Sequence, residues 1–180
     1  MKIIAFTGLP ASGKSVAVEV GKNKGIPVIR MGDLVWEETR KQGQTLNDKN
    51  VGNIANIMRK RYGKNIWAKR TVEKINSLKK SSHLIIDGVR NIEEIEYFKK
   101  ELGSDFFVVA IDATNELRRK RVIARGRIDD SKDLNSFIER DNREIQWGVQ
   151  KVMADADIVI LNNGSLDQFK KQIINVLQKL

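Results

Sequence analysis

The sequence contains no cysteine and only one histidine, His83. Without cysteine the chain has no disulfide scaffold, no thiolate metal site and no cysteine nucleophile. A single histidine also excludes a zinc site built from several histidines, and we expect His83 to be structural. The sequence thus excludes disulfide-stabilised domains, cysteine-dependent enzymes and multi-histidine zinc sites.

Long hydrophobic runs are missing as well. No stretch approaches the roughly 18 apolar residues of a membrane span. The apolar start, residues 1–6, is too short for a signal peptide, so we expect a cytoplasmic protein. There is no repeat, low-complexity segment or obvious linker, and a chain of 180 residues corresponds to about one domain. Prolines are few, which fits a helix-rich protein.

Negative charge is in deficit. Lysine and arginine total 33 against 23 aspartates and glutamates, which gives a formal net charge of +10. Such an excess predicts an acidic partner. Nucleotide phosphates, nucleic acid and an anionic membrane all qualify, and charge alone does not choose among them.

Five short apolar runs rich in β-branched residues predict strands. They are continuous rather than alternating, as expected for a parallel sheet covered on both faces. Segments with helical spacing lie between them, so we expect a doubly wound α/β fold. The expected strands are Lys2–Thr7, Ile26–Ile29, His83–Asp87, Asp105–Ile111 and Asp157–Leu161. The expected helices are one that starts at about Lys14, then Val51–Ser81, Asn91–Leu102, Asn115–Arg125, Asp133–Trp147 and Ser165–Leu180.

The strongest motif follows the first expected strand. Residues 8–15 read Gly-Leu-Pro-Ala-Ser-Gly-Lys-Ser and fit the phosphate-binding loop G-x-x-x-x-G-K-[ST]. Its glycines let backbone N–H groups turn toward phosphate oxygens. Lys14 supplies a charge to the β- and γ-phosphates, the Ser15 hydroxyl can ligate Mg²⁺, and the next helix points its N-terminus at the same phosphates. The candidate nucleotide-binding residues here are Gly8, Pro10, Ala11, Ser12, Gly13, Lys14, Ser15 and Val16.

The alternative for this segment is a glycine-rich turn with an incidental lysine. The strand before the loop and the helix after it argue against that alternative.

Two aspartates end expected strands, at the sheet edge where ligands bind in such folds. Asp87 follows one apolar run and Asp112 follows another. A carboxylate at this edge can hold the Mg²⁺ shell or orient a substrate hydroxyl. The alternative for both is a helix N-cap. The phosphate-binding loop favours a functional role for Asp87, whereas Asp112 stays open.

A basic cluster occupies residues 118–127, where six of ten side chains are basic and five of those are arginine. On a helix, Arg118, Arg121 and Arg125 share one face. Arginine forks suit phosphate oxygens, and phosphoryl transfer needs positive groups around the moving group. The alternatives are a solvated basic face, a nucleic-acid patch and salt bridges to nearby acids. The preference for arginine over lysine favours arginines of a lid that closes over phosphates.

The order of these motifs resembles that of nucleotide kinases of the adenylate kinase and dephospho-CoA kinase group. More closely, the chain resembles the archaeal adenylate-kinase-related P-loop proteins, over essentially its whole length. The resemblance implies a P-loop kinase fold: a five-stranded parallel sheet flanked by helices, a helical monophosphate-binding arm and a short helical lid. It also implies one domain with a core of residues 1–32, 82–114 and 152–180, an arm of residues 33–81 and a lid of residues 115–150.

On the acceptor side the resemblance involves two segments. Arg30-Met31-Gly32-Asp33 resembles the Gly-Asp of the monophosphate site, and Asp87-Gly88-Val89-Arg90 resembles the family's Asp-Gly-Phe-Pro-Arg, one residue shorter. Arg90 would then hold the acceptor phosphate. Glu94 stands where the family reads adenine with a glutamine, and Trp36 stands where it has an arginine. The implied acceptor-binding residues are Gly32, Asp33, Gly88, Val89 and Arg90.

Arg59, on the expected helix of the arm, is a further candidate for the acceptor, with a solvated helix face as its alternative. Trp36, Trp67 and Trp147 are expected to be packing residues.

On the donor side, Arg121 and Arg125 match the pair that begins the family's lid, where the first arginine stacks on the ATP base. Arg127 resembles the lid arginine that precedes two aspartates, and Arg140 the arginine that bridges donor and acceptor phosphates. Asn162 lies in a segment resembling the loop that lines adenine. The resemblance thus implies a catalytic set of Lys14, Asp87, Arg90, Arg127 and Arg140, with Ser15 and Asp87 at the metal.

These features predict an enzyme that uses Mg²⁺ to transfer the γ-phosphoryl of ATP to a small acceptor, with a nucleoside monophosphate such as AMP favoured. Dephospho-CoA is the rival acceptor, for which Asp33 is the candidate base. Two further alternatives are an ATP-binding switch that acts on RNA or a protein partner, and a polynucleotide end kinase. Nucleic acid is therefore a weighed but not a favoured partner, and no membrane partner is expected.

Overall fold

The computed structural model describes residues 1–78, 81–125 and 134–180. Within these residues the chain forms one sheet of five parallel strands in the order β2-β3-β1-β4-β5. This confirms the predicted α/β fold with its five-stranded parallel sheet. The strands are β1 (Lys2–Thr7), β2 (Val28–Arg30), β3 (His83–Asp87), β4 (Phe106–Asp112) and β5 (Ile158–Leu161).

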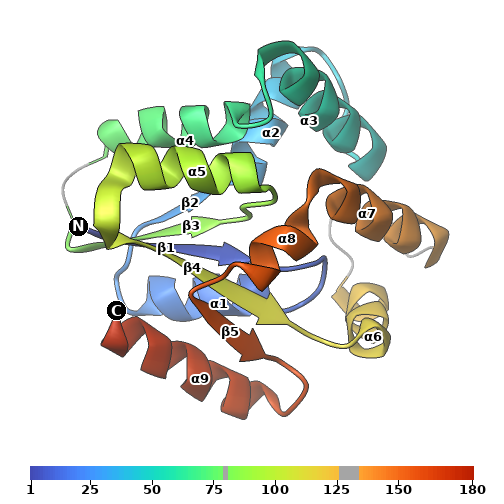
Figure 1. The fold of residues 1–180 in the computed structure, drawn as a ribbon. Coiled ribbons are helices and arrows are strands. Elements are labelled where there is room, and N and C mark those ends of the chain that lie inside the picture. The colour runs from blue at the N-terminus through green and yellow to red at the C-terminus, as the bar shows by residue number, and fades with distance from the viewer. Residues whose placement is uncertain (79–80, 126–133) are drawn as a thin grey trace.

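Helices cover both faces of this sheet (Figure 1). One face carries α1 and α9, and the opposite face carries α4, α5 and α8. Ile3 and Ile4 are neighbours in β1 but are buried on opposite faces, as the two-residue repeat of a strand requires. Burial on both faces explains the continuous apolar runs. These helices are α1 (Lys14–Asn23), α4 (Ile66–Asn76), α5 (Ile92–Leu102), α8 (Val149–Ala154) and α9 (Leu166–Lys179).

Four other helices gather at the edge of the sheet where the strands end (Figure 1). Because all strands run the same way, their carboxyl ends meet at this edge. The helices there close a space above the phosphate-binding loop. They are α2 (Met31–Lys41), α3 (Asp48–Tyr62), α6 (Asn115–Arg125) and α7 (Leu134–Trp147), while a short 3₁₀ turn, η1 (Gly103–Asp105), follows α5.

The prediction of a single helix over Val51–Ser81 is wrong. The structure has two helices there, because Gly63 adopts φ 96° and ends α3 before α4 begins. A positive φ is easy for glycine and stops a helix. The first of these helices also starts earlier than expected, since the side chain of Asn47 accepts a hydrogen bond of 2.8 Å from the Asn50 N–H and caps it.

The second strand is shifted relative to the expected Ile26–Ile29. The N–H of Ile26 donates to the carbonyl of Gly21 and so continues the turn that ends α1. Pro27 has no N–H for a strand ladder, and β2 begins only at Val28. Helices α2 and α8 were not predicted; α8 forms because Gly148, with φ 107°, breaks the chain after α7.

Within the described ranges, no helix combines the length and the apolar character needed to cross a membrane.

Candidate functional site

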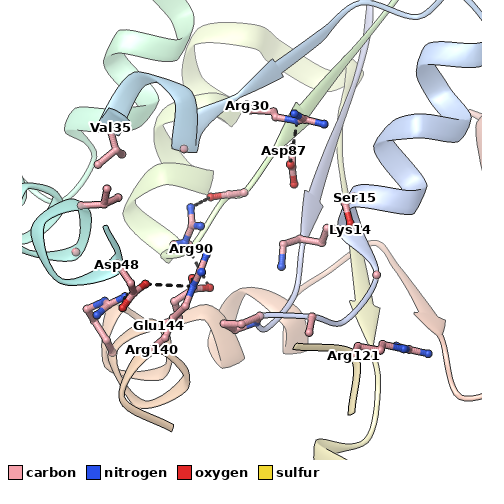
Figure 2. Close-up of a pocket in the computed structure, with 18 of the residues that line it drawn as sticks. Lys14, Ser15, Arg30, Val35, Asp48, Asp87, Arg90, Arg121, Arg140 and Glu144 are labelled. Atoms are coloured by element: carbon pink, nitrogen blue, oxygen red, sulfur yellow. Dashed lines mark hydrogen bonds and ion pairs between the residues drawn. The ribbon is translucent and has the colours of Figure 1, made fainter. Parts of the chain in front are cut away.

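A cavity of about 510 Å³ lies at the carboxyl edge of the sheet. Its walls come from the loop between β1 and α1, from α2, α3, α6 and α7, and from the segments that follow β3 and β5. Lys14, Ser15 and Arg121 lie on one side of the cavity, and Asp48, Arg90, Arg140 and Glu144 on the other (Figure 2). The predicted phosphate-binding side chains and several predicted acceptor residues therefore share one space.

The phosphate-binding loop requires its two glycines. Gly8 adopts φ 145°, and a Cβ there would lie 2.3 Å from the carbonyl oxygen of Ile111. Gly13 adopts φ 117°, and a Cβ there would lie 2.3 Å from Nδ2 of Asn162. Gly13 also begins α1 without a side-chain cap, so the first amide groups of the helix are left for an anion.

Lys14 turns back onto its own loop. Its Nζ donates hydrogen bonds to the carbonyl oxygens of Gly8 and, at 3.0 Å, of Leu9. Burial lowers the pKa of Lys14 to about 8, although Glu144 and Asp87 oppose this change. Because a phosphate would both accept these hydrogen bonds and favour the ammonium form, the loop is suited to a polyanion.

Asn162 and Arg121 brace the loop from the outside. Nδ2 of Asn162 donates to the carbonyl of Ser12 at 2.8 Å. Arg121 donates to the backbone carbonyl of Asn162 at 2.9 Å and to that of Ser12 at 3.3 Å. Burial lowers the pKa of Arg121. Both residues line the cavity, but the side chain of Asn162 is occupied by the loop itself.

Arg118 differs from Arg121 although a face was expected to hold both. It is 3% exposed and pairs through two nitrogens with the carboxylate of Asp141, one of the contacts being 2.9 Å. It also donates to the carbonyl of Pro10 at 3.2 Å. Arg118 therefore belongs to the salt-bridge alternative: it ties α6, α7 and the phosphate-binding loop together.

Asp87 presents an unsatisfied acceptor at the end of β3. Its Oδ2 lies 3.9 Å from Nε of Arg30, and its buried Oδ1 has no hydrogen-bond partner in the described part of the chain. Asp33 lies on the same wall; burial raises its pKa, which Arg30 opposes. A buried carboxylate oxygen without a partner is suited to a cation, a bound water or a hydroxyl.

The residues present fit Mg²⁺ bound together with phosphates and water. Among the described residues there is no group of three or more His, Cys, Asp or Glu side chains that could hold a metal ion. Ser15 and Asp87 both line the cavity, and Mg²⁺ is commonly held by one or two protein oxygens together with phosphates and waters.

Arg59 and Arg90 are held by one buried carboxylate. Glu94 accepts a hydrogen bond of 3.2 Å from Nη2 of Arg59 and one of 2.8 Å from the N–H of Arg90. Both oxygens of Glu94 are thus occupied beneath the arginines, and this side chain is fully buried. The position that the family resemblance assigns to reading a base therefore serves to hold two arginines here.

Helix α7 brings four side chains to the cavity: Arg140, Arg143, Glu144 and Trp147 all line it. Arg140 was the predicted site residue among them, whereas Trp147 was expected to be a packing residue and lies at the cavity instead. Their i, i+3, i+4, i+7 spacing on a helix is the signal that could have found the set. Asp48, at the start of α3, was also missed, because no motif surrounds it in the sequence and its partner Arg143 is far away along the chain.

Glu144 lies at the centre of the cations. Its carboxylate oxygens are each 3.5 Å from an arginine Nε, one of Arg90 and one of Arg140. Burial alone would raise the pKa of Glu144, but Arg90, Arg140 and Lys14 outweigh it and lower the pKa to about 2. Glu144 is therefore a fixed negative charge between the two walls of the cavity.

Some predicted residues lie beside the cavity or outside the described ranges. Val89 is buried, and its carbonyl accepts a hydrogen bond of 2.8 Å from Oγ1 of Thr7. The carbonyl of Asp112 accepts from the N–H of Asn162 at 2.7 Å, which is a structural contact. Arg127 and the side chain of Arg125 are outside the described residues. The predicted residues that line the cavity are Pro10, Ala11, Gly13, Lys14, Ser15, Val16, Gly32, Asp33, Arg59, Asp87, Gly88, Arg90, Arg121, Arg140 and Asn162.

The sheet order and the loop define a P-loop protein with a kinase-like fold. Residues 7–137 match a family model described as an AAA domain. The chain is 42% identical over 177 residues to a UPF0200 protein of Methanosarcina barkeri, with 98% of this chain and 95% of that protein covered. It is also 42% identical over 181 residues to a UPF0200/UPF0201 protein of Archaeoglobus fulgidus, of which it spans 56%. The chain therefore belongs to the UPF0200 family and carries the AAA domain that the family model describes.

Solved structures of kinases share the fold. A gluconokinase from Sinorhizobium meliloti superposes with a TM-score of 0.61 at 13% identity, covering 99% of this chain and 92% of that one. A shikimate kinase from Aquifex aeolicus superposes with a TM-score of 0.55 at 17% identity, covering 98% and 96%. At such identities the likeness concerns the fold alone.

Proposed function

We propose that this protein is an ATP- and Mg²⁺-dependent phosphotransferase that moves the γ-phosphoryl of ATP to a nucleoside monophosphate, with AMP favoured. One observation carries the proposal: the phosphate-binding loop with Lys14 and a group of arginines face each other across a single cavity (Figure 2). A site with one phosphate-binding wall needs one nucleotide, whereas two such walls suit a donor and an acceptor that both carry phosphate.

The donor occupies the loop side. Lys14 and the N–H groups at the start of α1 bind the β- and γ-phosphates. Ser15 and Asp87 hold Mg²⁺, which neutralises charge on the phosphates when bound. Arg121, fixed against the loop by Ser12 and Asn162, lies beside the donor and stacks on its base.

The acceptor occupies the side formed by α2, α3 and α7. Arg59, Arg90 and Arg143 line this side and bind the acceptor phosphate. Apolar side chains on the same wall give a planar base a surface to lie on. These are Val35, Trp36, Val51 and Ala55.

Phosphoryl transfer needs no covalent intermediate with the protein, which catalyses the reaction by positioning the substrates and stabilising charge. A phosphate oxygen of the acceptor is already anionic at neutral pH, so its attack on the γ-phosphorus needs no general base. Arg90 and Arg140, together with Arg127 from the segment outside the described residues, neutralise the charge of the moving phosphoryl. The arm of residues 33–81 and the lid of residues 115–150 close over both substrates and exclude water.

Dephospho-CoA is the second candidate acceptor, and Asp33 is the observation that favours it. A hydroxyl acceptor requires a base, and burial raises the pKa of this cavity-lining carboxyl. Asp33→Asn distinguishes the two acceptors: it should cost a hydroxyl acceptor about 100-fold or more in kcat and a phosphate acceptor far less.

A coupled phosphotransfer screen tests the proposal. Purified protein with ATP and Mg²⁺ is offered AMP, CMP, GMP, UMP, dephospho-CoA and a 5′-hydroxyl RNA, with Lys14→Ala as the control. Turnover on a nucleoside monophosphate that the control loses supports the proposal. Tight ATP binding without turnover on any acceptor rejects it in favour of an ATP-binding switch, and salt-dependent RNA binding then becomes the next measurement.

A further inference from the structure

Three arginines converge on one tryptophan. The guanidinium carbon of Arg59 lies 4.2 Å from the centroid of the Trp147 ring, that of Arg143 at 5.6 Å and that of Arg90 at 5.9 Å. Each arginine comes from a different segment: α3, α7 and the segment after β3. All four side chains line the cavity. Cations within about 6 Å of an indole face are attracted to it, so one ring orients three charges.

A carboxylate holds each of these arginines as well. Arg59 pairs with Glu94 at 3.2 Å, Arg90 with Glu144 at 3.5 Å and Arg143 with Asp48 at 2.7 Å. Asp48 and Glu144 are also each 3.5 Å from Nε of Arg140, so three carboxylates offset most of the charge of four arginines and leave an excess of one positive charge for an anion. Three positive groups close together would otherwise repel one another strongly at this depth.

Several guanidinium nitrogens near the Trp147 ring make no hydrogen bond to the described residues. In the described part of the chain, Nε and Nη1 of Arg59 and Nε of Arg143 are buried and have no hydrogen-bond partner, and Nε of Arg90 has only its 3.5 Å ion pair with Glu144. Buried donors on charged groups that make no hydrogen bond are costly. For Arg59, at 4.2 Å, the indole face takes the place of such a partner.

The ring itself is oriented by a hydrogen bond. Nε1 of Trp147 donates to Oδ1 of Asn56 on α3. The indole is therefore fixed at its edge by α3 and presents its face to the arginines. Phenylalanine would keep an aromatic face but would lose this bond, and leucine would lose both.

We propose that Trp147 is the positioning residue of the acceptor side: it aligns Arg59, Arg90 and Arg143 so that together they receive one phosphate group. The proposal rests on the phosphotransferase function proposed above for the choice of ligand. Trp147 acts through the arginines and does not itself take part in the transfer.

The test measures binding of inorganic phosphate by calorimetry while a non-hydrolysable Mg–ATP analogue fills the loop side, its γ-phosphate position included; the Kd of Mg–ADP is measured separately. Inorganic phosphate then has the arginines as its site, and the readout needs neither turnover nor the identity of the acceptor. Trp147→Leu should raise the phosphate Kd roughly tenfold, and Trp147→Phe should raise it by less than about threefold, because an aromatic face remains. The Kd of Mg–ADP should stay within about twofold of wild type in both.

Two further variants keep the test decisive. Asn56→Ala removes only the acceptor that orients the ring and should weaken phosphate binding by about two- to fourfold, so it replaces Trp147→Leu if that variant does not fold. Arg70→Gln breaks another arginine–tryptophan pair, with Arg70 lying 5.3 Å from the Trp67 ring on α4, and should leave phosphate binding unchanged.

The results separate this proposal from the one it rests on. Wild-type protein that binds no phosphate, or Trp147→Leu that binds it like wild type, overturns the role of Trp147. A loss of Mg–ADP binding equal to the loss of phosphate binding also overturns it, because the effect would then be general. A phosphotransfer screen without turnover would reject the kinase function yet leave the phosphate titration to be read on its own.

Discussion

The carboxylate of Asp48 accepts two hydrogen bonds from Nη2 of Arg143, at 2.7 and 2.8 Å, although the two residues are 95 positions apart in the chain. Asp48 begins α3 and Arg143 lies on α7, so this pair joins the expected arm to the expected lid segment. Gly52, one turn further along α3, makes the approach feasible. A Cβ on Gly52 would lie 2.7 Å from both Cζ and Nε of Arg143.

Gly52→Ala should therefore displace Arg143 and weaken the acceptor side. We expect the KM of the acceptor to rise about five- to tenfold while the KM of ATP stays within about twofold. Arg143→Ala should give a similar loss, and the double variant should be no worse than Arg143→Ala alone. Steady-state kinetics on the three variants measure this, and additive losses would contradict the contact.

Arg118 and Arg121 are three residues apart and should respond in opposite ways. Arg118→Met leaves Asp141 buried without its partner, so the free energy of unfolding should fall by about 3–5 kcal/mol. Arg121→Met should cost less than about 1 kcal/mol but should raise the KM of ATP. Urea unfolding and kinetics separate the two effects. Arg119→Met, at an exposed neighbour, is the matched control and should change neither quantity.

Nucleotide binding should take up a proton at alkaline pH. In the ligand-free protein the pKa of Lys14 is lowered to about 8, so Lys14 is mostly neutral at pH 9. The phosphates of ATP favour the ammonium form and raise that pKa again. We expect uptake of close to one proton per Mg–ATP at pH 9 and almost none at pH 7.

Calorimetry in two buffers of different ionisation enthalpy measures this uptake. Lys14→Arg keeps a permanent charge and should bind Mg–ATP without it. Equal proton uptake by the wild type and Lys14→Arg at pH 9 would show that another group is responsible.

Glu144 should make stability depend on acid pH. Its folded-state pKa of about 2 lies below the ordinary 4.5, so its contribution is complete above about pH 4.5 and is lost as the pH falls toward 2. The size of the shift corresponds to a contribution on the order of 3 kcal/mol. We expect the difference in unfolding free energy between wild type and Glu144→Gln to be constant above about pH 5 and to shrink between pH 4.5 and 2. Urea unfolding at a series of pH values tests this, and a difference that does not change with pH contradicts it.

The parallel sheet and the phosphate-binding loop were predictable because both leave local signals. The buried strands are continuous apolar runs. The loop is a short motif, and its two glycines stand where a side chain would clash with a neighbouring segment. The break after Tyr62 was missed, since Gly63 lies inside a pattern that continues as helical on both sides. The partners of the arginines were not predictable either. Asp48 reaches Arg143, Glu94 reaches Arg59 and Glu144 reaches Arg90 through tertiary packing, which spacing along the chain does not encode. The i, i+4 pair of Arg140 and Glu144 within α7 is the exception.

Helix α7 touches both halves of the cavity. Through Asp141 it holds Arg118, which in turn binds the carbonyl of Pro10 in the phosphate-binding loop; through Arg143 and Glu144 it shapes the acceptor side. If donor and acceptor bind as proposed, a ligand that shifts this helix on one side would change the free energy of binding on the other. By thermodynamic linkage, the factor by which the bound donor nucleotide changes the affinity for the acceptor equals the factor by which the bound acceptor changes the affinity for the donor. The affinity of each ligand would then depend on the other through the position of α7.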